Sequence, residues 1–348
     1  MRALVVTLSL ALISLHPAVS QNHRYQMRNT PVEPVSPWPE SSNSWPEVKL
    51  KLILLNDSLR TNSKLYIPDF QVFENGVEQQ IRAVSAMDSP ISLGLLIDGS
   101  GSTQPDREKF EAAAMTIVKG LPEGSEVMAA WFANKANIDL KFVPATEVDF
   151  ASIERSDMTG GTSIYDALID TEVYIAANAH NERRALVLLS DGGENSSMHS
   201  MEDAVRAFQW PDAPQLFTLD IADPRDTERE REAHVMTSLA TGGGGLAVIP
   251  GRDKSTPVPE SDEKSTAAVP SKGKDFSSGP FADLDVTAAA TRLAAILRRQ
   301  YVLTYITSNP NRDGQLRSLE VKLPPQFMKF KVYVLPGYYA PPEEPTRR

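Results

Sequence analysis

The chain of 348 residues contains no cysteine, which excludes disulfide bonds and a lipid anchor on a cysteine. No apolar run long enough to span a bilayer follows residue 20. Asp and Glu (45) outnumber Lys and Arg (35), so the formal net charge is −10. Nucleic acid and anionic lipid are therefore not expected as partners, because both need a basic surface.

The first twenty residues have the pattern of a signal peptide. Arg2 supplies a positive start, residues 3–15 form a short apolar run, and Ala-Val-Ser at 18–20 fits a cleavage site. The mature chain is expected to begin at Gln21, in the periplasm or outside the cell, with no integral membrane segment left. A retained membrane anchor is the alternative. An exported protein without disulfides must rely on packing and bound ions for stability.

Composition divides the remainder into segments of different character. We expect a disordered linker at 21–46, a β region at 47–88, an α/β domain at 89–300 with a mobile Ser/Lys/Pro-rich insert at 251–284, a second β region at 301–340, and a tail at 341–348.

Apolar strands alternate with amphipathic helices in the α/β segment. Strands are expected at 91–98, 126–133, 138–143, 184–191, 215–222 and 245–250, and helices at 106–120, 163–180, 199–209, 226–240 and 285–299. This alternation predicts an α/β fold with a doubly wound, mostly parallel sheet covered on both faces. Ligands of such sheets bind at the carboxyl ends of the strands.

The two β regions flank this domain. Asn75-Gly76, between two alternating runs, predicts a hairpin, because both residues tolerate positive φ. Each region is too short to bury a good core alone. We therefore expect 47–88 and 301–340 to pair into one β-sandwich into which the α/β domain is inserted.

Oxygen-bearing side chains gather where three of these elements begin or end. Asp98, Ser100 and Ser102 follow the first apolar strand, with glycines between them that let the loop curl. Thr162 follows Gly160-Gly161 at an expected helix N-cap, and Asp191 ends another strand. Carboxylate and hydroxyl oxygens are hard ligands that suit Mg²⁺, Mn²⁺ or Ca²⁺ rather than zinc.

These three motifs, in this order, resemble the metal-ion-dependent adhesion site of a von Willebrand factor type A (VWA) domain. The resemblance implies that Ser100, Ser102 and Thr162 ligate the ion, and that Asp98 and Asp191 hold it, one or both through water. The segments flanking the domain also resemble the VWFA-related Acidobacterial domain family of exported bacterial proteins. The insert at 251–284 departs from the VWA pattern, because it separates the last strand from the last helix.

The resemblance implies a cation-dependent protein-binding module for adhesion or scaffolding. Hydroxyl ligands leave the ion much of its positive charge, so an Asp or Glu carboxylate of a partner protein would replace a bound water. On this interpretation the chain is not an enzyme. The sequence predicts no oligomeric state.

Three other interpretations stay open. A metal-dependent hydrolase would need a general base, for which Glu194 is the candidate. A structural metal site would only stabilise the fold. A metal-free network would use the same hydroxyls to cap helices. His180, His199 and His234 are expected to be solvated on helix surfaces or ends rather than catalytic.

Overall fold

The protein is described here from a computed structural model. The structure describes residues 25–26, 44–56, 69–153, 160–222, 229–251, 281–327 and 329–343. The expected signal peptide lies outside the described residues, as do 21–24 and 27–43 of the linker, 252–280 of the insert and 344–348 of the tail.

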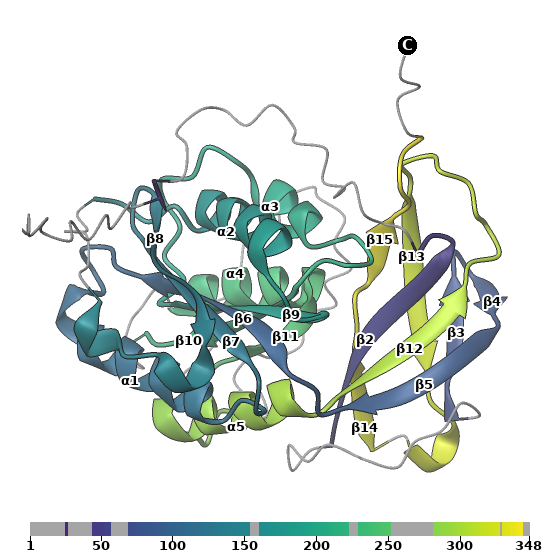
Figure 1. The fold of residues 1–348 in the computed structure, drawn as a ribbon, viewed down its shortest axis with the longest axis horizontal. Coiled ribbons are helices and arrows are strands. Elements are labelled where there is room, and N and C mark those ends of the chain that lie inside the picture. The colour runs from purple at the N-terminus through teal and green to yellow at the C-terminus, as the bar shows by residue number, and fades with distance from the viewer. Residues whose placement is uncertain are drawn as a thin grey trace, which may run out of the picture.

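A seven-stranded sheet forms the centre of the larger unit, in the order β1-β8-β7-β6-β9-β10-β11 (Figure 1). Its strands are β1 (Tyr25–Gln26), β6 (Ile91–Asp98), β7 (Glu126–Phe132), β8 (Ala136–Pro144), β9 (Arg183–Ser190), β10 (Gln215–Asp220) and β11 (Gly244–Val248). Neighbours from β7 to β11 are parallel, whereas β8 and β1 are antiparallel. The predicted doubly wound, mostly parallel sheet is confirmed.

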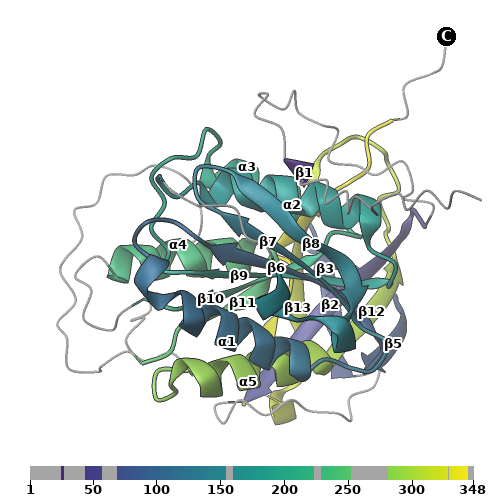
Figure 2. The ribbon, with the colours of Figure 1, turned by 60° about the vertical axis from the view of Figure 1, so that its left-hand side comes forward.

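Five helices cover the two faces of this sheet. They are α1 (Arg107–Lys119), α2 (Ile164–Asn178), α3 (Met201–Ala207), α4 (Arg229–Gly242) and α5 (Val286–Arg298). Side chains of β6 alternate between the faces: Leu93, Leu95 and Ile97 pack with α1 and α5, and Leu96 packs with α2, α3 and α4. Figure 2 shows α1 and α5 below the sheet and α2 and α3 above it.

The smaller unit is a sandwich of two four-stranded sheets, in the orders β14-β2-β12-β5 and β15-β13-β3-β4. The strands are β2 (Glu47–Asn56), β3 (Gln71–Glu74), β4 (Val77–Gln79), β5 (Ile81–Met87), β12 (Gln300–Ile306), β13 (Leu316–Lys322), β14 (Phe330–Tyr333) and β15 (Gly337–Tyr339). Each sheet contains two strands from before the α/β unit and two from after it, so the flanking regions form one sandwich, as the fold-class prediction stated.

The hairpin at Asn75-Gly76 is present, with φ of 49° and 78°. The run after it does not form one strand, because the chain crosses at Gln80 from one sheet to the other. Its first part is β4, and its second part is β5, which pairs with β12. Ile81 then packs against the sandwich core, a long-range contact that alternation in the sequence cannot predict.

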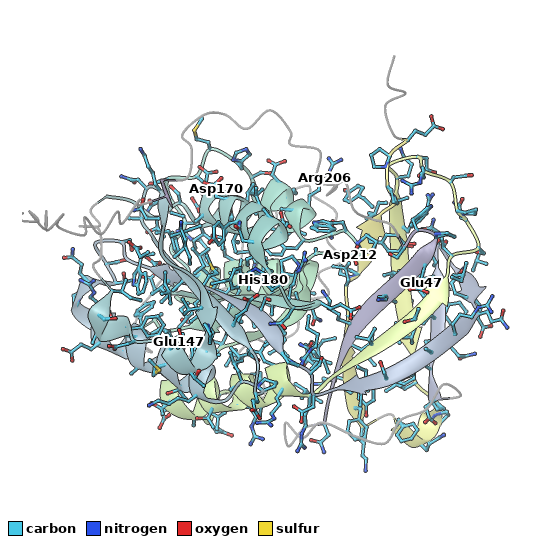
Figure 3. All side chains as sticks on the ribbon, viewed as in Figure 1. Glu47, Glu147, Asp170, His180, Arg206 and Asp212 are labelled. Atoms are coloured by element: carbon cyan, nitrogen blue, oxygen red, sulfur yellow. The ribbon has the colours of Figure 1, made fainter. Side chains whose placement is uncertain are left out.

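The sandwich docks against the amino ends of the parallel strands. Arg183, at the start of β9, donates hydrogen bonds to the carbonyls of Ser89 (2.5 Å) and Leu297 (2.5 Å), where the two units join. On the α3 side, the guanidinium of Arg206 lies 4.6 Å from the ring centroid of Tyr339 (Figure 3). The carboxyl ends of the strands therefore face away from the sandwich.

Candidate metal centre

Two neighbouring strands bring the first acidic groups of the site together. Every residue of β6 is buried, and the strand ends at Asp98. β9 is parallel to it, with Leu189 opposite Ile97, so Ser190, the last residue of β9, lies beside Asp98, and Asp191 follows directly after it. The meeting of these side chains at one sheet edge follows from parallel pairing.

The Asp98 carboxylate is the buried base of the site. Its Oδ1 accepts a hydrogen bond from the Ser100 N–H (2.9 Å), and its Oδ2 accepts one from the Ser190 hydroxyl (2.7 Å). Asp98 is 4% exposed. Burial, with the negative charge of Asp191 as the second cause, raises the pKa of Asp98 to about 6. A nearby cation would offset both effects.

A chain of short oxygen–oxygen contacts joins three of the other predicted ligands, Ser100, Ser102 and Asp191. The hydroxyls of Ser100 and Ser102 are 3.2 Å apart, and the Ser102 hydroxyl donates to Asp191 Oδ2 at 2.9 Å. Ligands at ~2.1 Å in an octahedron lie about 3.0 Å from one another. Small adjustments would therefore suffice for these oxygens to surround a single ion.

Thr162 lies in the adjoining loop and is not joined to the other four. Its N–H donates to Asn195 Oδ1 (2.8 Å) and its carbonyl accepts from the Asn195 N–H (3.0 Å). Among the described residues its hydroxyl makes no hydrogen bond to Asp98, Ser100, Ser102 or Asp191. The prediction that Thr162 is the helix N-cap is wrong, because Ser163 occupies that position.

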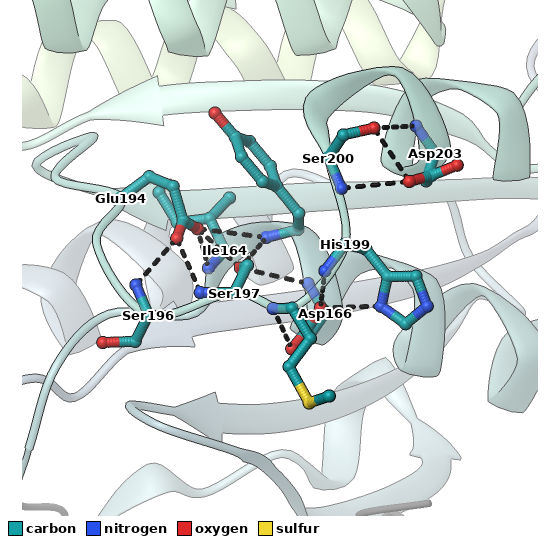
Figure 4. Close-up of polar contacts among 10 residues, drawn as sticks. Ile164, Asp166, Glu194, Ser196, Ser197, His199, Ser200 and Asp203 are labelled. Atoms are coloured by element: carbon teal, nitrogen blue, oxygen red, sulfur yellow. Dashed lines mark hydrogen bonds and ion pairs between the residues drawn. The ribbon is translucent and has the colours of Figure 1, made fainter. Parts of the chain in front are cut away.

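Glu194 caps α2 in place of an N-cap side chain, which Ser163 does not supply. Its Oε2 accepts hydrogen bonds from the Ile164 N–H (2.6 Å) and the Ser197 hydroxyl (2.8 Å), and its Oε1 accepts from the N–H groups of Ser196 (3.0 Å) and Ser197 (2.9 Å) (Figure 4). A carboxylate at a helix N-terminus is favourable. The geometry therefore assigns Glu194 to holding a loop, a poor arrangement for a general base.

Asp166 fastens the same loop from the first turn of α2. Its carboxylate accepts hydrogen bonds from the N–H groups of Met198 (2.9 Å) and His199 (3.0 Å), and His199 Nδ1 lies 2.8 Å from it. Figure 4 shows this cluster beside the Glu194 cap. His199 is half-buried rather than solvated, and we assign it to loop support.

Glycines permit close approach between the loops at positions 160 and 161, where the sequence predicted a tight turn. Gly160 has φ of 121°, and a Cβ there would collide with Asn134. A Cβ at Gly161 would collide with Asn195 and Ser196. At Gly101, by contrast, a Cβ would meet open space and φ is not positive, so the curl after Asp98 does not require glycine there.

The donor set fits a hard divalent cation. Asp98 and Asp191 bring two carboxylates to one place, and the hydroxyls of Ser100 and Ser102 lie between them. Sequence reasoning did not assign Ser190, although its place before Asp191 at the strand end was a usable signal. Within the described ranges, no cluster of three or more His, Cys, Asp or Glu residues could hold a metal. An ion at this edge would thus depend on serine hydroxyls.

Comparison with known proteins gives structural neighbours. No family model and no curated protein matches the chain. A von Willebrand factor type A protein from Catenulispora acidiphila is 12% identical, with 84% of this chain and 73% of that chain covered and a TM-score of 0.39. An aerotolerance-related membrane protein from Bacteroides fragilis is 18% identical, with 46% and 91% covered and a TM-score of 0.34. The ArnB paralog VWA2 from Sulfolobus acidocaldarius is 17% identical, with 57% and 50% covered and a TM-score of 0.37.

These values describe similarity and assign no activity. No helix among the described residues is long and apolar enough to cross a membrane. The strand order and the helices on both sheet faces give the chain the doubly wound α/β architecture that the alternating strands and helices of its sequence predicted.

Proposed function

We propose that this chain is an exported, divalent-cation-dependent protein-binding module. The observation that carries the proposal is the run of oxygens from Ser100 through Ser102 to Asp191, with contacts of 3.2 and 2.9 Å, beside the buried Asp98 carboxylate. Mg²⁺ is the first candidate, with Mn²⁺ and Ca²⁺ as alternatives. Thr162 would join the ion only after a rearrangement of its side chain or through water.

The partner class follows from the charge of such a site. Two carboxylates fill only part of the six-ligand shell of an octahedral ion. The hydroxyl ligands are neutral, so they do not reduce the positive charge of the ion further. An Asp or Glu carboxylate from a partner protein would complete the shell. The site lies at the sheet edge opposite the sandwich, so a partner could approach without displacing the smaller unit. Export rests on the signal pattern at residues 1–20.

The proposal assigns binding rather than catalysis to the site. Glu194 is the candidate general base of a hydrolase. Its carboxylate instead accepts hydrogen bonds from the start of α2 and from its own loop, and so holds the loop beside the site in place. The ion would supply positive charge and an exchangeable position, Ser100 and Ser102 would orient it, and Asp98 would anchor the loop below it.

A thermal-shift titration tests the proposal. The metal-stripped chain from Gln21 is titrated with Mg²⁺, Mn²⁺ and Ca²⁺ beside Ser102→Ala, which removes one exposed hydroxyl. Thr291→Ala is the matched control, because that hydroxyl bonds to the Thr287 carbonyl within α5. A saturable rise in Tm supports the ion site if the apparent affinity for the ion falls about tenfold or more in Ser102→Ala and does not fall in Thr291→Ala. No response of the wild-type protein to any ion refutes it.

Capture of partners then separates binding from a structural metal. Acidic peptides or protein ligands retained with Mg²⁺ and released by a chelator support the adhesion function. A Tm rise without any cation-dependent binding of carboxylate ligands would indicate that the metal only stabilises the fold.

A further inference from the structure

Strand β5 forms an open edge of the sandwich. It is the last strand in the order β14-β2-β12-β5, and within the described residues no segment pairs with its outer side. The strand has seven residues, and Arg82, Ala83, Ser85 and Ala86 are exposed. Within the part of the chain that the structure describes, its outward N–H and C=O groups are therefore left for another strand.

The other sandwich edges are covered or short. At the opposite end of the same sheet, β14 packs against the α/β unit through Tyr333. In the second sheet, the Tyr339 N–H of β15 donates to the Gln209 carbonyl (2.8 Å), and β4 has three residues. Figure 1 shows β4 on the side of the sandwich away from the α/β unit, and β5 running from that side to the junction between the two units. β5 is the longest of the four end strands.

The usual protection of an edge strand is confined to the first residues of β5. Lysines, inward-pointing charges, prolines and bulges keep natural edges from pairing. The sequence IRAVSAM has one charge, at Arg82, and no proline. A register shift against β12 lies between Thr304 and Tyr305, near the start of β5, and the pairing is regular from Ala83 onward.

We propose that β5 pairs antiparallel with β5 of a second copy of this chain, about a twofold axis at Val84. This register sets Arg82 opposite Ala86 and Ala83 opposite Ser85, so no like charges face each other. Small exposed side chains allow two sheets to meet without steric conflict. The joined sheet would have eight strands, and the two candidate metal centres would lie on the far units of the dimer. This inference is independent of the metal site.

The test uses paired charges at two exposed positions. In the proposed register, the double variant Ala83→Lys/Ser85→Lys places lysine opposite lysine twice, whereas Ala83→Glu/Ser85→Lys places glutamate opposite lysine twice. The dimer dissociation constant should rise about tenfold or more in the first and stay within about threefold of wild type in the second. Sedimentation equilibrium of residues 21–348 measures both constants, and melting curves of both variants check the fold.

Amide hydrogen exchange supplies a readout that needs no variant. In wild-type protein, β5 amides should become more protected as concentration rises, while those of β4 should not change. A wild-type chain that is monomeric at its highest soluble concentration overturns the proposal. Equal dimerisation of the two double variants, or equal dissociation of both, overturns the register about Val84. If the lysine pair unfolds the chain, the exchange experiment decides alone.

Discussion

Glu172 of α2 should make the protein less stable as the pH rises. The residue is 6% exposed, and its Oε1 atom has no hydrogen-bond partner among the described residues. Burial raises the pKa of Glu172 from 4.5 to about 8, although the positive charge of Arg184 lowers it in part. The native chain therefore holds this proton more tightly than the unfolded chain does.

The sign and size of the effect follow from proton linkage. The stabilising contribution of Glu172 is fully present below pH ~4.5 and is lost as the pH rises through about 8. One pKa unit corresponds to ~1.4 kcal/mol, so the free energy of unfolding should fall by up to about 5 kcal/mol over this range. Glu172→Gln keeps the shape of the side chain and removes the titration.

Urea denaturation at pH 5, 7 and 9 measures this difference. The Gln variant should match wild type near pH 5 and exceed it by several kcal/mol at pH 9. Glu108→Gln, on the exposed side of α1, is the matched control and should leave the pH dependence unchanged. Parallel curves for wild type and Glu172→Gln would show that this carboxyl titrates normally in the native state, and the reasoning from burial would fail.

Two further substitutions test the sandwich core and the loop packing. Glu74→Ala removes the carboxylate that accepts hydrogen bonds from the hydroxyls of Tyr305 (2.8 Å) and Tyr338 (2.7 Å), so the free energy of unfolding in urea should fall by about 3–5 kcal/mol; an unchanged midpoint would contradict the role of this cluster. Gly161→Ala should force the loop containing Ser196 outward and weaken the Mg²⁺ affinity measured by thermal shift about tenfold or more. In the absence of ion, the Tm of this variant should fall by only a few degrees. A Mg²⁺ affinity equal to that of the wild type would show that the loops adjust independently of the site.

Local patterns in the sequence predicted much of the α/β unit. The apolar run ending at Asp98 gave strand bounds of 91–98, which the structure reproduces, because a strand buried on both faces has a continuous apolar signature. The register of β6 against β9 then brings Asp98 next to Ser190, the residue before Asp191. Candidate ligands that end adjacent parallel strands are thus predictable without knowledge of side-chain contacts.

The supporting groups were less accessible to sequence reasoning. Glu194 was assigned a chemical role from its position near Asp191, but the structure places it under α2 as a cap. Asp166 carries no motif and fastens the loop through N–H groups 32 and 33 positions away. Such hydrogen bonds depend on where two loops meet, and this depends on packing rather than on spacing.

The site therefore combines two kinds of information. Asp98, Ser100 and Ser102 are positioned within one loop, where Asp98 accepts from the Ser100 N–H and the two hydroxyls are neighbours. Asp191 joins them because β9 pairs with β6, and Thr162 lies in a third loop, where its N–H bonds to Asn195. Thr162 is the one predicted ligand that the structure leaves apart from the others. Ion binding should consequently order the Thr162 loop more than the loop after β6, and amide exchange with and without Mg²⁺ would show the larger change at residues 160–163.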